Sequence, residues 1–243
     1  MRRLLLILAI AAPLHADAVV DLRAALARLT AREPIRVTCD VQRAVNSEGK
    51  WDNQKFNGVA SLHLEADAAG VRLSYPRSLL EQIERELATR AKDPKQPTPT
   101  VSAAQQIDLV NATHALDAAQ PLLNMLDGAK VVEDRGGTWQ GKPARVVIFR
   151  LENKPERGVG KVTVSENKLT LWLGADDVPL AAEHRRVAKF SLLFLKGEST
   201  SKHSWHFAHI GDRLVRTRIE ESESGSGLGQ KGTSSVVATL RVL

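Results

Sequence analysis

Cysteine is nearly absent from this 243-residue chain, which has only Cys39. A single cysteine cannot form a disulfide within the chain, so the fold must rest on its apolar core. Cys39 lies in the segment IRVTCDV, in phase with the apolar residues Ile35, Val37 and Val41. This phase predicts a buried small side chain, and no local motif supplies the base that a catalytic thiolate needs.

Aromatic residues are also scarce, since phenylalanine, tryptophan and tyrosine together make up 4% of the chain. The positions expected to face inward are mostly Leu, Val, Ile and Ala. Flexible aliphatic walls suit acyl chains, whose binding requires apolar area rather than hydrogen bonds.

The N-terminal apolar run, Leu4–Leu14, is too short for a membrane span, which takes about 20 residues. It follows two arginines and precedes the A-x-A sequence Ala16–Ala18. This order predicts a cleavable signal peptide at residues 1–18, with cleavage after Ala16 as the other option. An uncleaved anchor is the alternative, but the short apolar run does not favour it. We therefore expect a periplasmic or secreted protein that does not span the membrane after signal cleavage.

The charge is moderately basic, with 34 Lys and Arg against 28 Asp and Glu. The basic residues are scattered, and Arg185-Arg186 is the only adjacent pair in the strand-rich region. A scattered excess fits a solvated surface, or weak attraction to anionic lipid, better than a nucleic-acid groove. We expect no nucleic-acid partner.

The second half of the chain reads as a series of strands. In its centre, Lys161–Lys196, apolar side chains recur at alternate positions on both sides of a turn at Ala175–Pro179. Period two predicts strands with one buried face, and the Gly, Asp and Pro residues suit a reversal. Further strands are expected at Ile35–Arg43, Lys55–Glu65, Val71–Tyr75, Val131–Arg135, Thr138–Gln140, Ala144–Leu151, Lys202–Ile210, Arg213–Glu221 and Ser235–Leu243, with a flexible loop at Ser222–Thr233.

Helical spacing replaces the strand period elsewhere. It predicts an N-terminal helix at Val20–Ala31 and a helix at Ser78–Ala91 that begins with the capping box S-L-L-E. A second capping box at Ser102–Gln105 opens another helix, and a short helix follows at Pro121–Leu126. Between the capping boxes, Lys92–Val101 contains three prolines and predicts an extended surface loop.

The order of elements is a helix, early strands, a block of helices and a long series of strands. This order predicts an α+β fold with an antiparallel sheet. A sheet of that size must twist and curl or close. We expect residues 19–243 to form a single half-barrel domain, in which a curved antiparallel sheet makes an unclosed β-barrel with an inserted helical lid and an N-terminal helix.

The apolar residues of the lid and of the facing sheet are the candidate ligand site. Ordinary core packing is the alternative for each of them. The candidates on the helices are Leu80, Ile83, Leu87, Ile107, Val110, Leu122 and Met125, and those on the sheet are Leu171, Phe190 and Leu192.

His203, His206 and His209 are spaced by three, which on a helix would place them together near a metal. Trp205 and Phe207 lie between them, and the segment reads as a strand. On a strand His206 faces away from the other two histidines, which lie about 20 Å apart. We therefore expect no metal site here.

Other polar motifs have structural interpretations. The glycines of Gly225–Gly229 would need a following helix to bind phosphate, and a strand-like run follows instead. Asp108, Asp117 and Asp176-Asp177 suit helix caps and turns. The serines show no nucleophile-elbow pattern. We expect no enzymatic activity and no cofactor.

The order of elements resembles the periplasmic lipoprotein-carrier superfamily, the Lol-type (LolA-like) unclosed β-barrels. The resemblance rests on the strand Val71–Pro76 running into the helix at Ser78, the hairpin Thr138–Pro143, and Leu169–Leu180 with its D-D-x-P-L turn. It covers nearly the whole of residues 19–243 as an arrangement of elements, and it carries over no functional residue. It implies a helical lid over a curved sheet and the transport of lipid or lipoprotein.

These observations predict an exported, non-enzymatic binding protein that holds a lipid or acyl chain between sheet and lid, as a lipid or lipoprotein carrier does. The alternative is an envelope interaction or sensing module with the same fold and no small ligand. In that module the rims Lys92–Val101 and Ser222–Thr233 would contact an envelope protein. An enzyme is the third alternative and the one least favoured.

Overall fold

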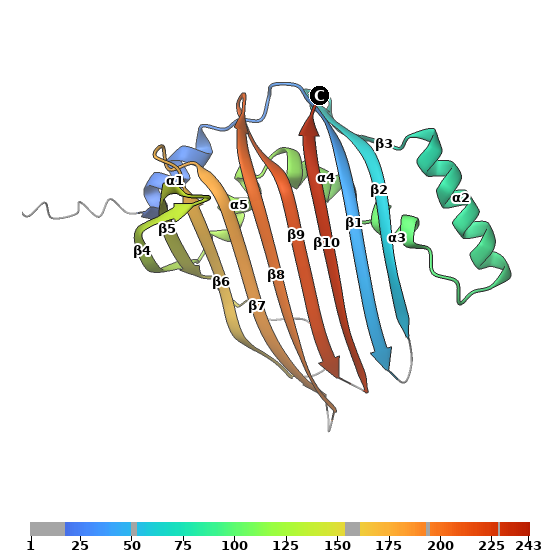
Figure 1. Cartoon of the computed structure of the whole chain (residues 1–243). Coiled ribbons are helices and arrows are strands. Elements are labelled where there is room, and N and C mark those ends of the chain that lie inside the picture. The colour runs from blue at the N-terminus through green and yellow to red at the C-terminus, as the bar shows by residue number, and fades with distance from the viewer. Residues whose placement is uncertain (1–17, 50–52, 154–160, 193–194, 228) are drawn as a thin grey trace, which may run out of the picture.

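The computed structural model describes residues 18–49, 53–153, 161–192, 195–227 and 229–243 (Figure 1). The predicted signal peptide, apart from Ala18, lies outside these ranges. Among the helices that these ranges contain, none has the length and apolar character that a membrane crossing requires.

The described residues form ten strands and five helices. The strands are β1 (Ile35–Gly49), β2 (Gln54–Asp67), β3 (Gly70–Ser74), β4 (Lys130–Trp139), β5 (Lys142–Arg150), β6 (Lys161–Leu173), β7 (Pro179–Leu192), β8 (Leu195–Ile210), β9 (Arg213–Gly227) and β10 (Gln230–Val242). The helices are α1 (Ala18–Ala27), α2 (Arg77–Lys92), α3 (Pro99–Ala104), α4 (Leu109–Leu116) and α5 (Ala119–Met125).

All ten strands belong to one antiparallel sheet in the order β3-β2-β1-β10-β9-β8-β7-β6-β5-β4. The first and last strands of the chain, β1 and β10, are therefore neighbours inside the sheet. Within the described residues β3 and β4 are the two ends of this order, so the sheet does not close into a barrel. The predicted fold class, an α+β fold with an unclosed antiparallel sheet and an N-terminal helix, is confirmed.

The core lies on one face of the sheet, which we call the inner face. Cys39 illustrates how it forms, because it pairs with Leu62 of β2 on one side and Leu240 of β10 on the other. All three side chains are buried, and burial raises the pKa of the Cys39 thiol to about 12. The prediction that Cys39 is a buried small side chain is confirmed.

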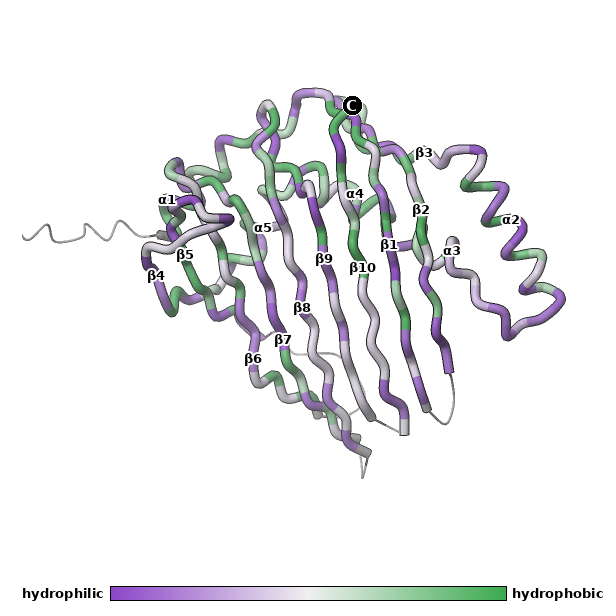
Figure 2. Tube along the Cα trace, in the orientation of Figure 1, coloured by the Kyte–Doolittle hydropathy of each residue, from purple (hydrophilic) through white to green (hydrophobic). Residues whose placement is uncertain are grey.

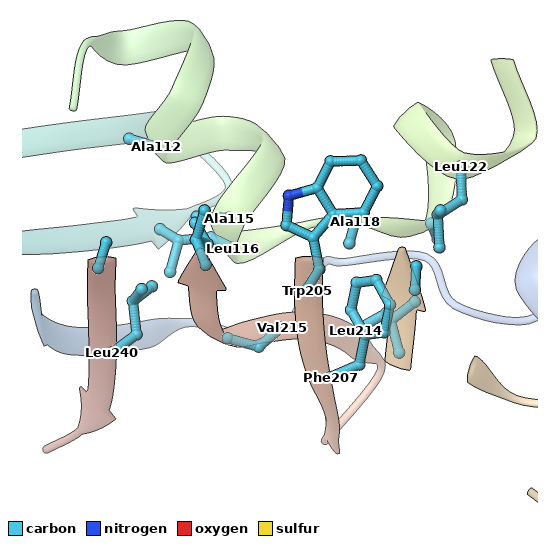
Figure 3. Packing of buried hydrophobic residues seen from close by; sticks show 14 of the residues in the cluster. Ala112, Ala115, Leu116, Ala118, Leu122, Trp205, Phe207, Leu214, Val215 and Leu240 are labelled. Carbon is cyan, nitrogen blue, oxygen red and sulfur yellow. The ribbon is translucent and has the colours of Figure 1, made fainter. Parts of the chain in front are cut away.

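Helices cover the upper part of the inner face (Figure 1). Figure 3 shows Leu116 of α4 and Leu122 of α5 packed over the residues of β8, β9 and β10. At the β2 side, α3 lies against the backbone of Gly58, where a Cβ atom would come within 1.9 Å of the Pro99 carbonyl oxygen. A residue without a side chain is what permits this close approach.

The lower part of the sheet extends beyond the helices. In Figure 2 the tube of β8, β9 and β10 becomes pale toward its lower end, because serine, threonine and glycine dominate there. The apolar alternation that holds α4 and α5 thus ends midway along these strands. Below that point β8, β9 and β10 present mostly small and polar side chains on the inner face.

Both predicted capping boxes are wrong. Helix α2 begins at Arg77 after Pro76, and Ser78 lies inside its first turn. Helix α3 begins at Pro99, because proline suits the first helical position, where its missing N–H has no partner to lose. The N-terminal N–H groups of α3 are capped from another helix, since the Glu86 carboxylate accepts hydrogen bonds from the N–H groups of Thr100 and Val101 at 3.0 to 3.2 Å.

The predicted loop at Ser222–Thr233 is also wrong over most of its length. Strand β9 continues to Gly227 and β10 begins at Gln230, so the loop is a short hairpin. Its polar composition misled the prediction, because strand pairing satisfies backbone groups whatever the side chains are. Gly229 has a φ of 76°, a value that favours glycine in the turn.

Candidate functional site

Polar side chains meet on the inner face at the level where the helices end. His184 of β7 pairs with His203 of β8, and His203 pairs with Glu221 of β9. Because directly opposed residues of antiparallel strands place their side chains on the same face, these three residues form a row. Asn167 of β6 extends the row, since its Oδ1 lies 2.8 Å from Nε2 of His184.

The centre of the row is an ion pair between His203 and Glu221, with 3.5 Å between Nδ1 and Oε1. The hydrogen bond to Glu221 raises the pKa of His203, and the same bond lowers the pKa of Glu221. The ring of His184 stacks on that of His203 at 6.0 Å. Burial lowers the pKa of His184, and the neighbouring His203 adds to this effect. The site therefore favours a charged His203 beside a neutral His184.

Trp205 and Arg216 lie directly above this row. The Trp205 ring stacks on His203 at 6.2 Å, and the Arg216 guanidinium carbon lies 4.6 Å from the Trp205 ring centroid. Arg216 is only 8% exposed, and burial lowers its pKa to about 10 although Glu221 acts in the opposite direction. We call His184, His203, Trp205, Arg216 and Glu221 the polar cluster.

An irregularity between β8 and β9 explains why Arg216 faces inward. His206 pairs with Arg218 and Phe207 pairs with Arg216, so Thr217 has no direct partner in β8. A bulge of this kind switches the face on which the following side chains lie. Arg216 consequently lies on the side of the buried Phe207, beneath the helices, and an uninterrupted ladder would have turned it outward.

Helices α4 and α5 fix the upper side of the polar cluster. Trp205 stands between Leu116 of α4 and Leu122 of α5 (Figure 3). The N–H of Ala118 donates a hydrogen bond of 2.8 Å to the carbonyl oxygen of Leu214, which anchors the α4–α5 connection to β9. Burial lowers the pKa of His114 on α4, and the charge of Arg216 adds to this effect.

A groove of about 570 Å³ begins one step below the polar cluster. Its inner-face lining includes Ser201, Arg186 and Glu223, which lie two residues along their strands from His203, His184 and Glu221. Residues two apart on a strand lie about 7 Å apart on the same face. We call this groove the trough, and its lining also includes Val45, Ser234 and Phe190.

Phe190 occupies the lower end of the trough by lying across two glycines. A Cβ atom at Gly197 would come within 2.0 Å of the Phe190 ring, and one at Gly227 within 2.8 Å. The ring therefore rests on the backbone of β8 and β9. It is 36% exposed, so its free face is an apolar surface in the trough.

The sequence-predicted site residues fall into three groups. Ile107, Leu122 and Leu171 are buried in the core, and Ile83 and Met125 are partly buried against it. Leu80, Leu87 and Val110 are exposed at 44%, 49% and 60%, and they do not face the core. Phe190 lines the trough, and Leu192 ends β7 with a side chain that lies outside the described residues. Ligand binding by these residues stays a prediction.

Two other expectations, for the faces of the histidines and for Asp108, are met. His203 and His206 lie on opposite faces, because His203 stacks on the inward Trp205 and His206 contacts Trp139 edge to face. Asp108 caps α4 by accepting a hydrogen bond of 2.7 Å from the N–H of Asn111. In the ranges that the structure describes, no group of three His, Cys, Asp or Glu side chains could hold a metal ion.

Arg216 is the residue that the sequence analysis missed. The only signal is its position, because it directly follows the apolar pair Leu214-Val215 within a predicted strand. Alternation alone assigns it to the solvent face, and the bulge at Thr217 reverses that assignment. A bulge that has no glycine leaves no recognisable mark in the sequence.

The sequence matches no family model and no curated protein. Among solved structures, a DUF1329 family protein from Desulfovibrio piger is similar to this chain, with 9% sequence identity, coverage of 93% of each chain and a TM-score of 0.29.

Proposed function

We propose that this chain is an exported, non-enzymatic binding protein that holds a lipid or acyl chain on the open part of its inner face. The observation that carries the proposal is the trough, an open groove on the inner face below the polar cluster that described helices do not line. Its volume of about 570 Å³ lies in the range of roughly 300–1,000 Å³ that is usual for small-molecule sites. The resemblance to Lol-type lipoprotein carriers suggests the same kind of role.

The chemistry of the trough favours an amphipathic ligand. Val45 and the free face of Phe190 supply apolar contact area, while Arg186 and Glu223 are charged. The small side chains of Ser201 and Ser234 leave space above the sheet. An acyl chain can lie along this floor with its polar end toward the polar cluster.

The proposed ligand lies beyond the helices. Leu122 and Leu171, which the sequence placed around a cavity beneath the lid, are both fully buried in the core. Residues with no exposed surface cannot contact a ligand unless the helices move. The trough needs no such movement, because its lining is already accessible.

A non-enzymatic role is favoured by the contacts of the two histidines. In the described part of the chain, His184 and His203 make their hydrogen bonds to Asn167 and Glu221. Among the described residues neither histidine is hydrogen-bonded to a serine, threonine or cysteine, the arrangement that activates a nucleophile.

Lipid analysis of the protein purified from an envelope fraction tests the proposal. Native mass spectrometry should detect a bound lipid on the wild-type chain. Phe190→Ser and Val45→Ser should both reduce the bound fraction, because they remove apolar area from the trough. Val59→Ser is the matched control, since Val59 is 60% exposed and lies on the opposite face of β2. Failure of the wild-type protein to retain or take up any lipid would overturn the proposal.

A second candidate function is an envelope interaction module, and helix α2 is the observation that favours it. Leu80 and Leu87 are exposed on α2, which projects from the β3 edge of the sheet and packs against α3 (Figure 1). If this helix binds an envelope protein, Leu80→Glu and Leu87→Glu should abolish capture of that protein and leave lipid content unchanged. Loss of lipid with retained capture would support the first function instead.

A further inference from the structure

The polar cluster contains a buried cation with an unpaired hydrogen-bond donor, the Nε–H of Arg216. Arg216 is 8% exposed, and its Nε atom has no hydrogen-bond partner among the described residues. Its contacts are the face of the Trp205 ring and the more distant charge of Glu221. Buried charges are normally both paired and hydrogen-bonded, so an exception points to a function.

A second unused donor lies beside the first. The indole nitrogen of Trp205 is buried and has no partner within the described residues, and the Arg216 guanidinium stacks on the same indole ring. Both groups are donors only, since neither an indole N–H nor a guanidinium can accept a hydrogen bond. Only an acceptor can satisfy them together.

The surrounding charges also favour an anion. The hydrogen bond to Glu221 raises the pKa of His203, which favours its charged form, and His203 lies between Trp205 and the trough. Glu221 opposes an incoming anion, but it is engaged with His203. Guanidinium groups bind carboxylate and phosphate oxygens in a fixed planar geometry, which makes arginine the usual residue for this purpose.

We propose that Arg216 and the Trp205 indole N–H form a binding site for one oxyanion, the carboxylate or phosphate headgroup of an amphiphile whose acyl chain lies in the trough. This inference rests on the proposed function and names the class of ligand, an acidic lipid. The headgroup passes His203, which is 23% exposed and lies two residues along β8 from the trough residue Ser201. Because both donor atoms are buried, the side chains around them must move to admit the headgroup.

Binding of a matched pair of amphiphiles to delipidated protein tests the inference. Dodecanoate carries a carboxylate, and dodecanol has the same chain with a neutral headgroup. Because a hydrogen bond to a charged group contributes about 1.5–3 kcal/mol, dodecanoate should bind about tenfold more tightly or better. Arg216→Met should remove this preference and leave dodecanol affinity unchanged. Arg218→Met is the matched control, since Arg218 is 41% exposed and pairs with Glu220.

The Trp205 indole N–H provides a direct readout. Its resonance in a proton–nitrogen correlation spectrum, assigned with Trp205→Phe, should move downfield when dodecanoate binds and stay in place with dodecanol. Equal affinity of the two amphiphiles for the wild-type protein would overturn the headgroup site and leave lipid binding intact. Binding of neither would overturn both proposals. Binding of inorganic phosphate as tightly as dodecanoate would overturn the assignment to a lipid headgroup.

Discussion

The ligand-free protein should become more stable when Arg216 is replaced by methionine. Burial lowers the pKa of Arg216 well below its ordinary value, to about 10, which corresponds to roughly 3 kcal/mol against the charged form in the folded state. Arg216 is charged in both the folded and the unfolded protein at neutral pH, so the whole cost of burying the charge reduces the free energy of unfolding. Methionine removes the cost and keeps most of the apolar stem, but it loses the contact with the Trp205 ring, which contributes about 1 kcal/mol.

The expected net gain is therefore about 2 kcal/mol, in line with replacements of buried ionic groups by apolar side chains. For a chain of this size it corresponds to a rise in Tm of about 4–8 °C. Thermal unfolding of delipidated protein, followed by circular dichroism, measures the change. Arg218→Met should leave Tm nearly unchanged, because exposed ion pairs contribute little.

The result that would refute this reasoning is a fall in Tm for Arg216→Met. Such a fall would mean that stacking on Trp205 and attraction to Glu221 outweigh the cost of burial. Arg216 would then be a structural residue, and its missing hydrogen bonds would give no evidence for a ligand. A gain in stability together with a loss of dodecanoate binding is the signature of a residue retained for function.

Three further outcomes are expected. Arg145→Ala should lower the free energy of unfolding by about 2–3 kcal/mol in urea titrations, because this side chain joins three carboxylates from α1, β4 and a turn. His184 and His203 should affect the pH dependence of stability in opposite directions, as histidine NMR titrations and unfolding at different pH values would show. Because the pKa of His184 is lowered in the folded state, stability falls as the pH falls through 6.5. Because the pKa of His203 is raised in the folded state, it contributes stability below pH 6.5 that is lost as the pH rises through its folded pKa. Gly58→Ala should lower the free energy of unfolding by about 1–3 kcal/mol, because the new Cβ atom would lie 1.9 Å from the Pro99 carbonyl oxygen.

Each of these outcomes has a control. Arg135→Ala removes an exposed pair with Glu133 and should change stability by less than about 1 kcal/mol; equal losses from Arg135→Ala and Arg145→Ala would contradict the network. Gly225→Ala places a Cβ at 3.4 Å from its nearest neighbour and should be tolerated better than Gly58→Ala. The charged groups that act on the histidine pair are Glu221, Glu223, Arg186 and Arg216. Identical pKa values for His184 and His203 would contradict the predicted opposite shifts.

Side-chain alternation was enough to predict the sheet, and the periods of two and 3.6 separated strands from helices in most of the chain. The exceptions share a physical cause, which is that distant contacts decide the local structure. Glu86 caps a helix that starts thirteen residues later, at Pro99, so no local motif could show where α3 begins. Ser222–Thr233 forms a hairpin because its backbone pairs with neighbouring strands on both sides.

The candidate site was less accessible to sequence reasoning than the fold was. Apolar residues such as Leu122 and Leu171 were expected to line a cavity, but sequence cannot distinguish a cavity wall from a packed core. Phe190 does line the trough. Its ring rests on Gly197 and Gly227, which lie on two other strands, so no local sequence motif shows this contact. The inward turn of Arg216 depends on one unpaired residue in a ladder, which only the three-dimensional register reveals.

The position of a bound acyl chain tests the central claim most directly. A fatty acid with a nitroxide group near the end of its chain broadens the NMR signals of nearby backbone groups. The account predicts the strongest broadening at Ser199, Gly225 and Ser234 in the trough, with little effect at Leu80 and Leu87 of α2. Broadening centred on α2, or none at all, would contradict it.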